Sequence, residues 1–307
     1  MPGFWNGVSQ FYPGKPTFTE RDVPDLRGKV SSISSRGQPG DTGPKSQREQ
    51  VYIVTGSNTG IGKEVAQILY TKHARVYVAA RSERKGRATI EAIKQAVPNS
   101  TGTLEFLHLD LADLTTIKPS AEEFLSKEKE LHVLFNNAGV WCAPRGSKTV
   151  QDYELHLGVN NIGPFMFTKL LTPILLETAK GELPGTVRVV WTSSFGAEHG
   201  SYVPGGVQMD NLDYHDDKPP VFKYNVSKAG NYLHAVEFAN RYKALGVNSI
   251  SLNPGNLDTD LIRDVGPTTR FLLRHLFGHP PVYGAYTELF AGFSPEVPAQ
   301  KTERWGK

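Results

Sequence analysis

The chain has 307 residues, with 34 basic and 31 acidic side chains and a formal net charge of +3. These charges are spread along the chain, so no basic stripe indicates a nucleic-acid partner. Cys142 is the only cysteine, which excludes an internal disulfide, and the nine histidines show no ligand spacing, so we expect no metal site. Because a long apolar run and a signal-like N-terminus are both lacking, we expect no stable membrane insertion and a cytoplasmic location.

Strand-like and helix-like segments alternate along the chain. The predicted strands are 51–54, 75–79, 104–107, 131–135, 187–191 and 249–252, and the predicted helices include 88–97, 114–126, 153–177 and 224–244. This alternation predicts an α/β fold, a single Rossmann-type doubly wound parallel sheet with helices on both faces. Ligands of such sheets bind beyond the carboxyl ends of the strands.

The first predicted strand runs into a glycine-rich turn, Thr55-Gly56-Ser57-Asn58-Thr59-Gly60-Ile61-Gly62. Apolar residues at helical spacing follow over 63–70, so the turn lies at the N-terminus of a helix. Glycines allow a close backbone approach, and the unpaired amides and the helix dipole favour an anion such as a pyrophosphate. An ordinary strand-to-helix turn is the alternative.

Tyr224 and Lys228 lie one turn apart on the same face of a predicted helix. A phenol has a pKa of about 10 and is a poor base at neutral pH, and a nearby ammonium group would lower that pKa and make the phenol usable in proton transfer. For an isolated Tyr-x-x-x-Lys, an exposed helical pair is the alternative.

With four further segments, the turn and the pair make the chain resemble the short-chain dehydrogenase/reductase family, classical type, from about Val51 to Pro295. These segments are Asn136-Asn137-Ala138-Gly139, Asn160 within 158–165, Ser194 at the end of a predicted strand, and Pro254-Gly255 with Thr259. All six matches stand in the family's order. The long interval between Ser194 and Tyr224 resembles the retinol-dehydrogenase-like branch.

The resemblance implies a role for each matching residue. Tyr224 would exchange a proton with the substrate oxygen and Ser194 would orient that oxygen. Lys228 would hold the nicotinamide ribose, and Asn160 would position a water beside it. The implied cofactor-binding residues are Gly56, Ser57, Asn58, Gly60, Ile61, Gly62, Arg81, Asp110, Asn137, Ala138, Gly139, Tyr224, Lys228, Pro254, Gly255 and Thr259.

The end of the second predicted strand bears on the choice of cofactor. A carboxylate at this place would repel the 2′-phosphate of NADP(H), but the chain has Ala80 followed by Arg81. A guanidinium can pair with that phosphate. We therefore expect NADP(H) in preference to NAD(H). Ser82, Arg84 or Lys85 are candidate helpers, and a solvated basic loop is the alternative. Asp110 matches the family's adenine-ring aspartate, with a strand-end cap as its alternative.

The predicted function is an NADP(H)-dependent oxidoreductase that interconverts an alcohol and a carbonyl on an apolar small molecule. Bulky apolar residues at 261–262, 271–273 and 276–277 stand where the family carries its substrate lid, and core or subunit packing is their alternative. Trp141 and Cys142 are expected near the cleft, without a catalytic role. The competing functions are a regulatory or catalytically impaired nucleotide-binding protein, and an epimerase or dehydratase of the extended branch.

Two segments depart from the family pattern. Within an N-terminal extension, 1–50, the stretch 30–50 is polar and is expected to be disordered, and a retained intron or a genuine loop would explain it. The NAD(P)-binding domain is then 51–307. After a helix-like segment at 284–292 the chain soon stops, so we expect a truncation or a frameshift near Val297. The last edge strand of the sheet would then be missing. A homodimer is one possible assembly.

Overall fold

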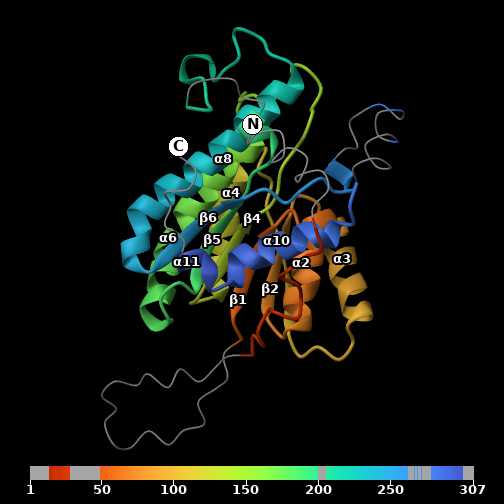
Figure 1. The fold of residues 1–307 in the computed structure, drawn as a ribbon, viewed down its shortest axis with the longest axis vertical. Coiled ribbons are helices and arrows are strands. Elements are labelled where there is room, and N and C mark those ends of the chain that lie inside the picture. Colours follow the sequence, from red (N-terminus) through yellow and green to blue (C-terminus); the bar gives the residue numbers. More distant parts are fainter. Residues whose placement is uncertain are drawn as a thin grey trace, which may run out of the picture.

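Six parallel strands form one sheet with the order β3-β2-β1-β4-β5-β6 (Figure 1). The computed structural model describes residues 14–27, 49–199, 205–261, 266, 268, 271 and 278–299. The strands are β1 Val51–Thr55, β2 Arg75–Ala80, β3 Thr103–His108, β4 Val133–Asn136, β5 Val187–Thr192 and β6 Val247–Leu252. The predicted parallel, doubly wound sheet is confirmed.

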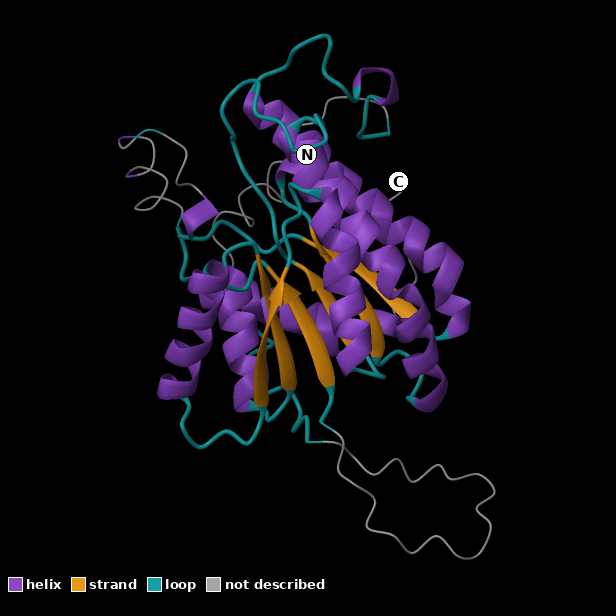
Figure 2. Ribbon diagram, turned by 180° about the vertical axis from the view of Figure 1, so that it is seen from behind, coloured by secondary structure: helices purple, strands orange, loops and turns teal. Residues whose placement is uncertain are grey.

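Helices cover both faces of this sheet (Figure 2). One face carries α2 Gly60–Thr71, α3 Glu83–Ala96 and α10 Pro281–Phe293, and the other carries α4 Leu114–Lys127, α6 Gly163–Gly181 and α8 Pro220–Tyr242. The short elements are α5 Leu155–Leu157, η1 Gly158–Ile162, α7 Gly196–His199, η2 Met209–Asn211, η3 Lys243–Leu245 and α11 Glu296–Ala299. Within the described ranges, no helix combines the length and apolarity needed to cross a bilayer.

Alternate strand residues fill two hydrophobic cores. In β1, Val51 and Ile53 face the core that contains α4 and α6, whereas Tyr52 and Val54 face the core that contains α2 and α10. Every residue of β1 is buried, as expected of a central parallel strand with helices on both sides. A continuous apolar run is therefore the sequence pattern that this position requires.

The predicted helix over 153–177 is divided in the structure. It consists of α5, the π-helical turn η1 and α6. The wider π turn contains Asn160, whose side chain bonds outside the helix to the main chain of Val140 and to Ser227. These outside contacts, which the helical period does not reveal, are the physical reason for the break.

Parts of the predicted organisation fall outside the described residues. Of the expected insertion 30–50, only Glu49 and Gln50 are described, and most of the expected lid and the last eight residues of the chain are also outside. Among the described residues, β6 stands at the edge of the sheet and no strand follows it. The domain boundary and the origin of the insertion stay predictions.

Arg188 in β5 is a buried cation that ties the sheet to the end of α10. Its guanidinium donates to the main-chain carbonyls of Gly185 at 2.7 Å, Ala291 at 2.8 Å and Ser294 at 3.0 Å. Carbonyls at a helix C-terminus have no partner within the helix, so Arg188 acts as a cap for α10. Burial lowers the pKa of Arg188 to about 10, which leaves it charged at neutral pH.

We expect Arg188→Met to lower the free energy of unfolding by roughly 2–4 kcal/mol, because buried carbonyls lose a charged donor. Urea denaturation measures this loss. Arg241→Met is the matched control, since Arg241 is exposed and pairs with Glu237 on the helix surface, where a change within about 0.5 kcal/mol is expected. Equal losses in the two variants would contradict the capping role.

Candidate active site

The carboxyl ends of the strands surround a cleft of about 290 Å³ that brings most of the predicted site residues together. Those that line it are Gly56, Asn58, Gly60, Ile61, Arg81, Asp110, Asn137, Ala138, Gly139, Tyr224, Lys228, Pro254 and Thr259. Ser57, Gly62, Asn160, Ser194 and Gly255 are not among the lining residues. The glycine turn and the Tyr224–Lys228 pair, far apart in sequence, therefore share one cleft.

Two glycines of the turn have backbone conformations that favour glycine. Gly56 has φ +69° and Gly60 has φ +57°, and a Cβ on Gly56 would lie 2.9 Å from the Cα of Ala138. Gly62 is required for another reason, because a Cβ there would lie 2.5 Å from Asn137 Nδ2. Gly62 thus serves the packing of the turn and does not line the cleft.

The start of α2 fits a bound anion. Thr59 is the N-cap, but its side chain makes no capping hydrogen bond and its hydroxyl donates to Asp260 at 2.9 Å. The amides of the first turn thus donate no hydrogen bond to the N-cap side chain, and the helix dipole adds positive potential there. The turn's close backbone approach and these amides fit the pyrophosphate of a dinucleotide.

The segment after β4 locks the glycine turn in place. Thr55 Oγ1 donates to the carbonyl of Phe135 at 3.1 Å and accepts from the amide of Ala138 at 3.0 Å. Asn137 Nδ2 donates to the carbonyl of Thr55 at 2.7 Å, and Asn136 Nδ2 donates to Thr168 Oγ1 at 2.9 Å. Asn136 therefore binds the helix layer through Thr168, and Asn137 binds the glycine turn through Thr55.

Tyr224 lines the cleft and is buried. Burial raises the pKa of its phenol to about 12, although a hydrogen bond with Ser194 opposes the rise. This direction is opposite to the lowering expected from Lys228. The Lys228 ammonium lies 5.7 Å from the centroid of the Tyr224 ring, and burial lowers its own pKa to about 8.

Lys228 is held by the end of β5. Its Nζ donates to the carbonyl of Thr192 at 2.8 Å, and its own carbonyl accepts from Ser193 Oγ at 2.7 Å. Asn231, one turn further along α8, also donates to the Thr192 carbonyl, at 3.0 Å. The lysine is thus fixed at both its main chain and its ammonium group.

Asn160 anchors the loop after β4 against α8. Its Nδ2 donates to Ser227 Oγ at 2.8 Å and to the carbonyl of Val140 at 3.1 Å, and its Oδ1 accepts from the amide of Val140 at 2.8 Å. A Cβ on Gly139 would lie 3.1 Å from Asn160 Oδ1 and 3.3 Å from Lys228 Nζ. Asn160 and Lys228 thus meet at Gly139, which has no side chain to separate them.

The part of the cleft after β2 carries the residues expected to select the cofactor. Arg81 directly follows β2, and its side chain is exposed. Ser82 Oγ accepts from the amide of Lys85 at 3.4 Å and caps α3. Asp110 Oδ1 accepts from the amide of Ala112 at 2.9 Å, as expected of a cap at a strand end. Asp110 also lines the cleft, so the expected contact with the adenine ring stays a prediction.

Sequence reasoning missed three residues that hold the site together. Thr192 and Ser193 bind Lys228, and their only sequence signal is a polar cluster at the end of an apolar strand. Glu288 accepts from Thr192 Oγ1 at 2.8 Å and is fully buried. It is the only charged residue of α10, and a lone acid in an apolar helix is the signal that could have found it.

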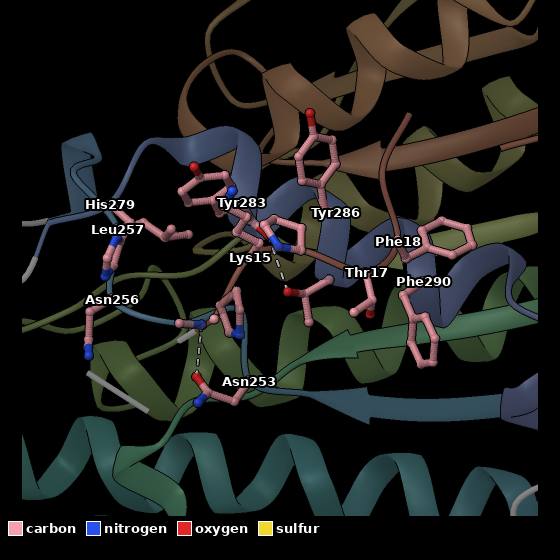
Figure 3. Close-up of a pocket in the computed structure, with 15 residues that line it drawn as sticks. Lys15, Thr17, Phe18, Asn253, Asn256, Leu257, His279, Tyr283, Tyr286 and Phe290 are labelled. Atoms are coloured by element: carbon pink, nitrogen blue, oxygen red, sulfur yellow. Dashed lines mark hydrogen bonds between the residues drawn. The ribbon is translucent and has the colours of Figure 1, made fainter. Parts of the chain in front are cut away.

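A second cavity, of about 610 Å³, adjoins the cleft at Pro254. Figure 3 shows Lys15 and Phe18 of the N-terminal segment facing Tyr283, Tyr286 and Phe290 of α10 across it. The rings of Phe18 and Phe290 meet edge to face at 5.6 Å. Although larger, this cavity holds none of the four predicted catalytic residues, so the smaller cleft is the candidate active site.

Comparisons with known proteins agree with this geometry. Residues 50–203 match the sequence model of the family described as short chain dehydrogenase. A relative from Phomopsis amygdali, named short-chain dehydrogenase/reductase, is 51% identical, with 96% of this chain and 82% of the relative covered. The short-chain dehydrogenase/reductase sthC of Phaeosphaeria nodorum is 45% identical, with 100% of this chain and 91% of the relative covered.

Solved structures share the fold. One is a 3-ketoacyl-(acyl-carrier-protein) reductase from Brucella melitensis complexed with NADH, with a TM-score of 0.62 and 19% identity, covering 82% of this chain and 93% of that one. Another is a Pseudomonas aeruginosa RhlG/NADP active-site complex, with a TM-score of 0.61 and 23% identity, covering 80% of this chain and 90% of that one. At these identities the likeness shows the fold alone.

The chain belongs to the short-chain dehydrogenase/reductase family. It is accordingly an oxidoreductase that uses a nicotinamide cofactor and acts on CH–OH or carbonyl groups of small molecules. The cradle of Gly56, Gly60 and the start of α2 fits such a dinucleotide on structural grounds.

We expect Gly62→Ala to lower the free energy of unfolding by about 1–3 kcal/mol and to weaken cofactor binding, because the added methyl group overlaps Asn137. Thermal unfolding and a fluorescence titration with NADPH measure the two effects. Gly181→Ala is the control, since beyond its own stretch of helix no described atom lies within 4 Å of its added Cβ. If Gly62→Ala behaved like the control, the packing role of Gly62 would be wrong.

Proposed function

We propose that this protein is an NADP(H)-dependent oxidoreductase that interconverts an alcohol and a carbonyl on an apolar small molecule, with Tyr224 as general acid and base. One observation carries the proposal: Tyr224 and Lys228 line the same cleft as the glycine turn and Arg81. A proton donor, a phosphate-binding turn and a basic selector then act on one bound dinucleotide and its substrate.

The residues of the cleft divide the chemistry between them. When bound, the nicotinamide supplies the hydride for carbonyl reduction, or accepts it in alcohol oxidation. Tyr224 gives its proton to the carbonyl oxygen, and Ser194, which is hydrogen-bonded to Tyr224, orients that oxygen. The Lys228 ammonium stabilises the phenolate that remains and holds the nicotinamide ribose. Asn160 fixes the neighbouring loop and positions a water beside Lys228.

The state of Tyr224 suits the reducing direction. Its pKa of about 12 means that the phenol holds its proton at neutral pH. A protonated phenol can donate to a carbonyl oxygen at once, whereas alcohol oxidation first requires that the proton be removed. In the proposed mechanism Tyr224 therefore acts as the acid in carbonyl reduction.

The preference for NADP(H) rests on the charge at the end of β2. Arg81, Ser82 and Lys85 line the cleft there, and no acidic residue follows Ala80 directly. A guanidinium can form two parallel hydrogen bonds with a phosphate, which an uncharged ribose hydroxyl cannot match. We therefore assign the ribose phosphate to Arg81, with Ser82 and Lys85 as its neighbours.

An apolar substrate is supported by the side chains around Tyr224. The rings of Trp141 and Tyr224 meet edge to face at 6.3 Å between centroids, and the centroid of the His156 ring lies 6.4 Å from that of Tyr224. Leu155 and Val159 line the same cleft as Tyr224. Such a wall favours an apolar carbonyl compound. The homodimer stays a prediction.

We expect Tyr224→Phe to lower turnover at least about a hundredfold while NADPH binding stays nearly unchanged, because the variant loses only the proton donor. A panel of aldehydes and ketones first identifies a carbonyl that the wild type reduces, and this carbonyl is used for both proteins. Tyr153→Phe is the control, since Tyr153 is exposed and lies outside the cleft. Normal turnover by Tyr224→Phe would remove Tyr224 from its role.

We expect Arg81→Ala to weaken NADPH binding about tenfold or more and to change NADH binding less than about twofold, because only NADPH carries the ribose phosphate. Fluorescence titration with each dinucleotide measures both constants. Arg87→Ala is the matched control, since Arg87 pairs with Glu83 at 2.7 Å and does not line the cleft. An equal loss for both dinucleotides in Arg81→Ala would contradict the selector role.

A further inference from the structure

Glu288 is a buried acid in an otherwise uncharged helix. It lies in α10, whose sequence is PVYGAYTELFAGF, and its exposure is 0%. Burying an ionised carboxylate is costly unless a partner compensates for it. The carboxyl of Glu288 therefore needs a physical explanation that helix packing does not supply.

The carboxyl has one partner and one free oxygen. Oε1 accepts from Thr192 Oγ1 at 2.8 Å, whereas Oε2 is buried and finds no hydrogen-bond partner among the described residues. The neutral amide of a glutamine would accept the same Thr192 hydrogen bond at a smaller cost of burial. Satisfying Thr192 is thus not a sufficient reason for an acid at this position.

Thr192 connects Glu288 to Lys228. The Thr192 carbonyl accepts from Lys228 Nζ at 2.8 Å, so a single residue contacts both ionisable side chains. Glu288 reaches Thr192 from α10 and Lys228 reaches it from α8, on opposite faces of the sheet (Figure 1). Asn231 Nδ2 also donates to this carbonyl, and its Oδ1 is a second buried acceptor without a described partner.

The electrostatic interaction between the two ionisable groups is mutual. The Glu288 charge raises the pKa of Lys228 against the larger lowering by burial, and the Lys228 charge lowers the pKa of Glu288 against the larger rise by burial. Two other charged groups beside α10, Glu20 and Arg188, have partners of their own. On α10, Tyr286 bonds with Glu20, and Arg188 donates to the carbonyls at the end of the helix.

We propose that Glu288 is a positioning residue of the active site, whose buried carboxylate acts through Thr192 to keep Lys228 charged and in place. The proposal rests on the function proposed above, in which the Lys228 ammonium supports Tyr224 and the nicotinamide ribose. Glu288 does not line the cleft, so it acts through Lys228 and does not touch the cofactor or substrate.

A direct test measures the titration of Lys228. Isotope-labelled lysine side chains are followed by NMR across the pH range in the full chain, and the Lys228 signal is identified by its absence in Lys228→Arg. We expect Glu288→Gln to lower the pKa of Lys228 from about 8 by roughly one unit, which is about a tenfold loss of ammonium above that pH. Glu237→Gln is the matched control, since Glu237 is exposed and pairs with Arg241.

A second variant keeps the proposal testable if Glu288→Gln does not fold. Thr192→Val keeps Glu288 and the Thr192 carbonyl but removes the hydroxyl that donates to the carboxylate, so Glu288 holds its proton more tightly and Lys228 loses support. We expect a smaller shift of the Lys228 pKa in the same direction. An unchanged Lys228 pKa in folded Glu288→Gln overturns the proposal, and an unchanged value in Thr192→Val overturns the route through Thr192.

NADPH affinity distinguishes this proposal from the proposed function. Near about pH 6 Glu288 is protonated in the wild type, so Glu288→Gln and wild type should bind NADPH equally. Near pH 8 the variant should bind about threefold to fivefold more weakly, because a fall of one unit in the Lys228 pKa leaves about a tenth of that lysine charged instead of about half. A constant difference at both pH values would indicate a structural effect and overturn the proposal. A wild type that binds no dinucleotide would contradict the proposed function and leave the NMR result standing.

Discussion

Thr192, the last residue of β5, joins both helical layers to the end of the sheet. Its carbonyl accepts from Lys228 and Asn231 of α8, and its hydroxyl donates to Glu288 of α10. Thr192 is paired with Leu252 of β6, so the register of the sheet fixes the position of the Thr192 groups that Lys228, Asn231 and Glu288 contact. A shift of one residue would turn the hydroxyl to the opposite face and separate Glu288 from the lysine. The position of the ammonium group thus depends on strand pairing in the core.

The phosphate end of the cleft depends on the sheet in a similar way. Asn137 holds the carbonyl of Thr55 and fills the space that a side chain at Gly62 would need, while Ala138 lies against Gly56. The segment that follows β4 therefore shapes the turn that follows β1. Gly139, in the same segment, lets Asn160 and Lys228 approach each other. Both ends of the cleft are consequently positioned by one short stretch at the centre of the sheet.

The sequence predicted the sheet well because short continuous apolar runs bounded by turn residues, such as 51–54, are typical of a strand buried on both faces. It also predicted that the glycine turn and Pro254 would lie together, because carboxyl ends of parallel strands lie on one edge, whereas the place of Tyr224 in the same site was implied by the family resemblance. It did not predict the raised pKa of Tyr224, which follows from burial beneath distant side chains such as Trp141. Nor did it single out Glu288, whose partner Thr192 lies 96 positions earlier and has no periodic relation to it.

The raised pKa of Tyr224 changes what Lys228 has to do in the proposed mechanism. If the phenol keeps its proton at neutral pH, the ammonium has no phenolate to stabilise until Tyr224 begins to donate. The attraction between the two then grows as negative charge develops on the phenol oxygen, so it stabilises the transition state more than the ground state. Such an interaction raises kcat rather than tightening substrate binding, provided that Lys228 is charged when the reaction begins. Burial works against that charge and Glu288 supports it, so the carboxyl on the far face of the sheet sets how much of the effect is present near neutral pH.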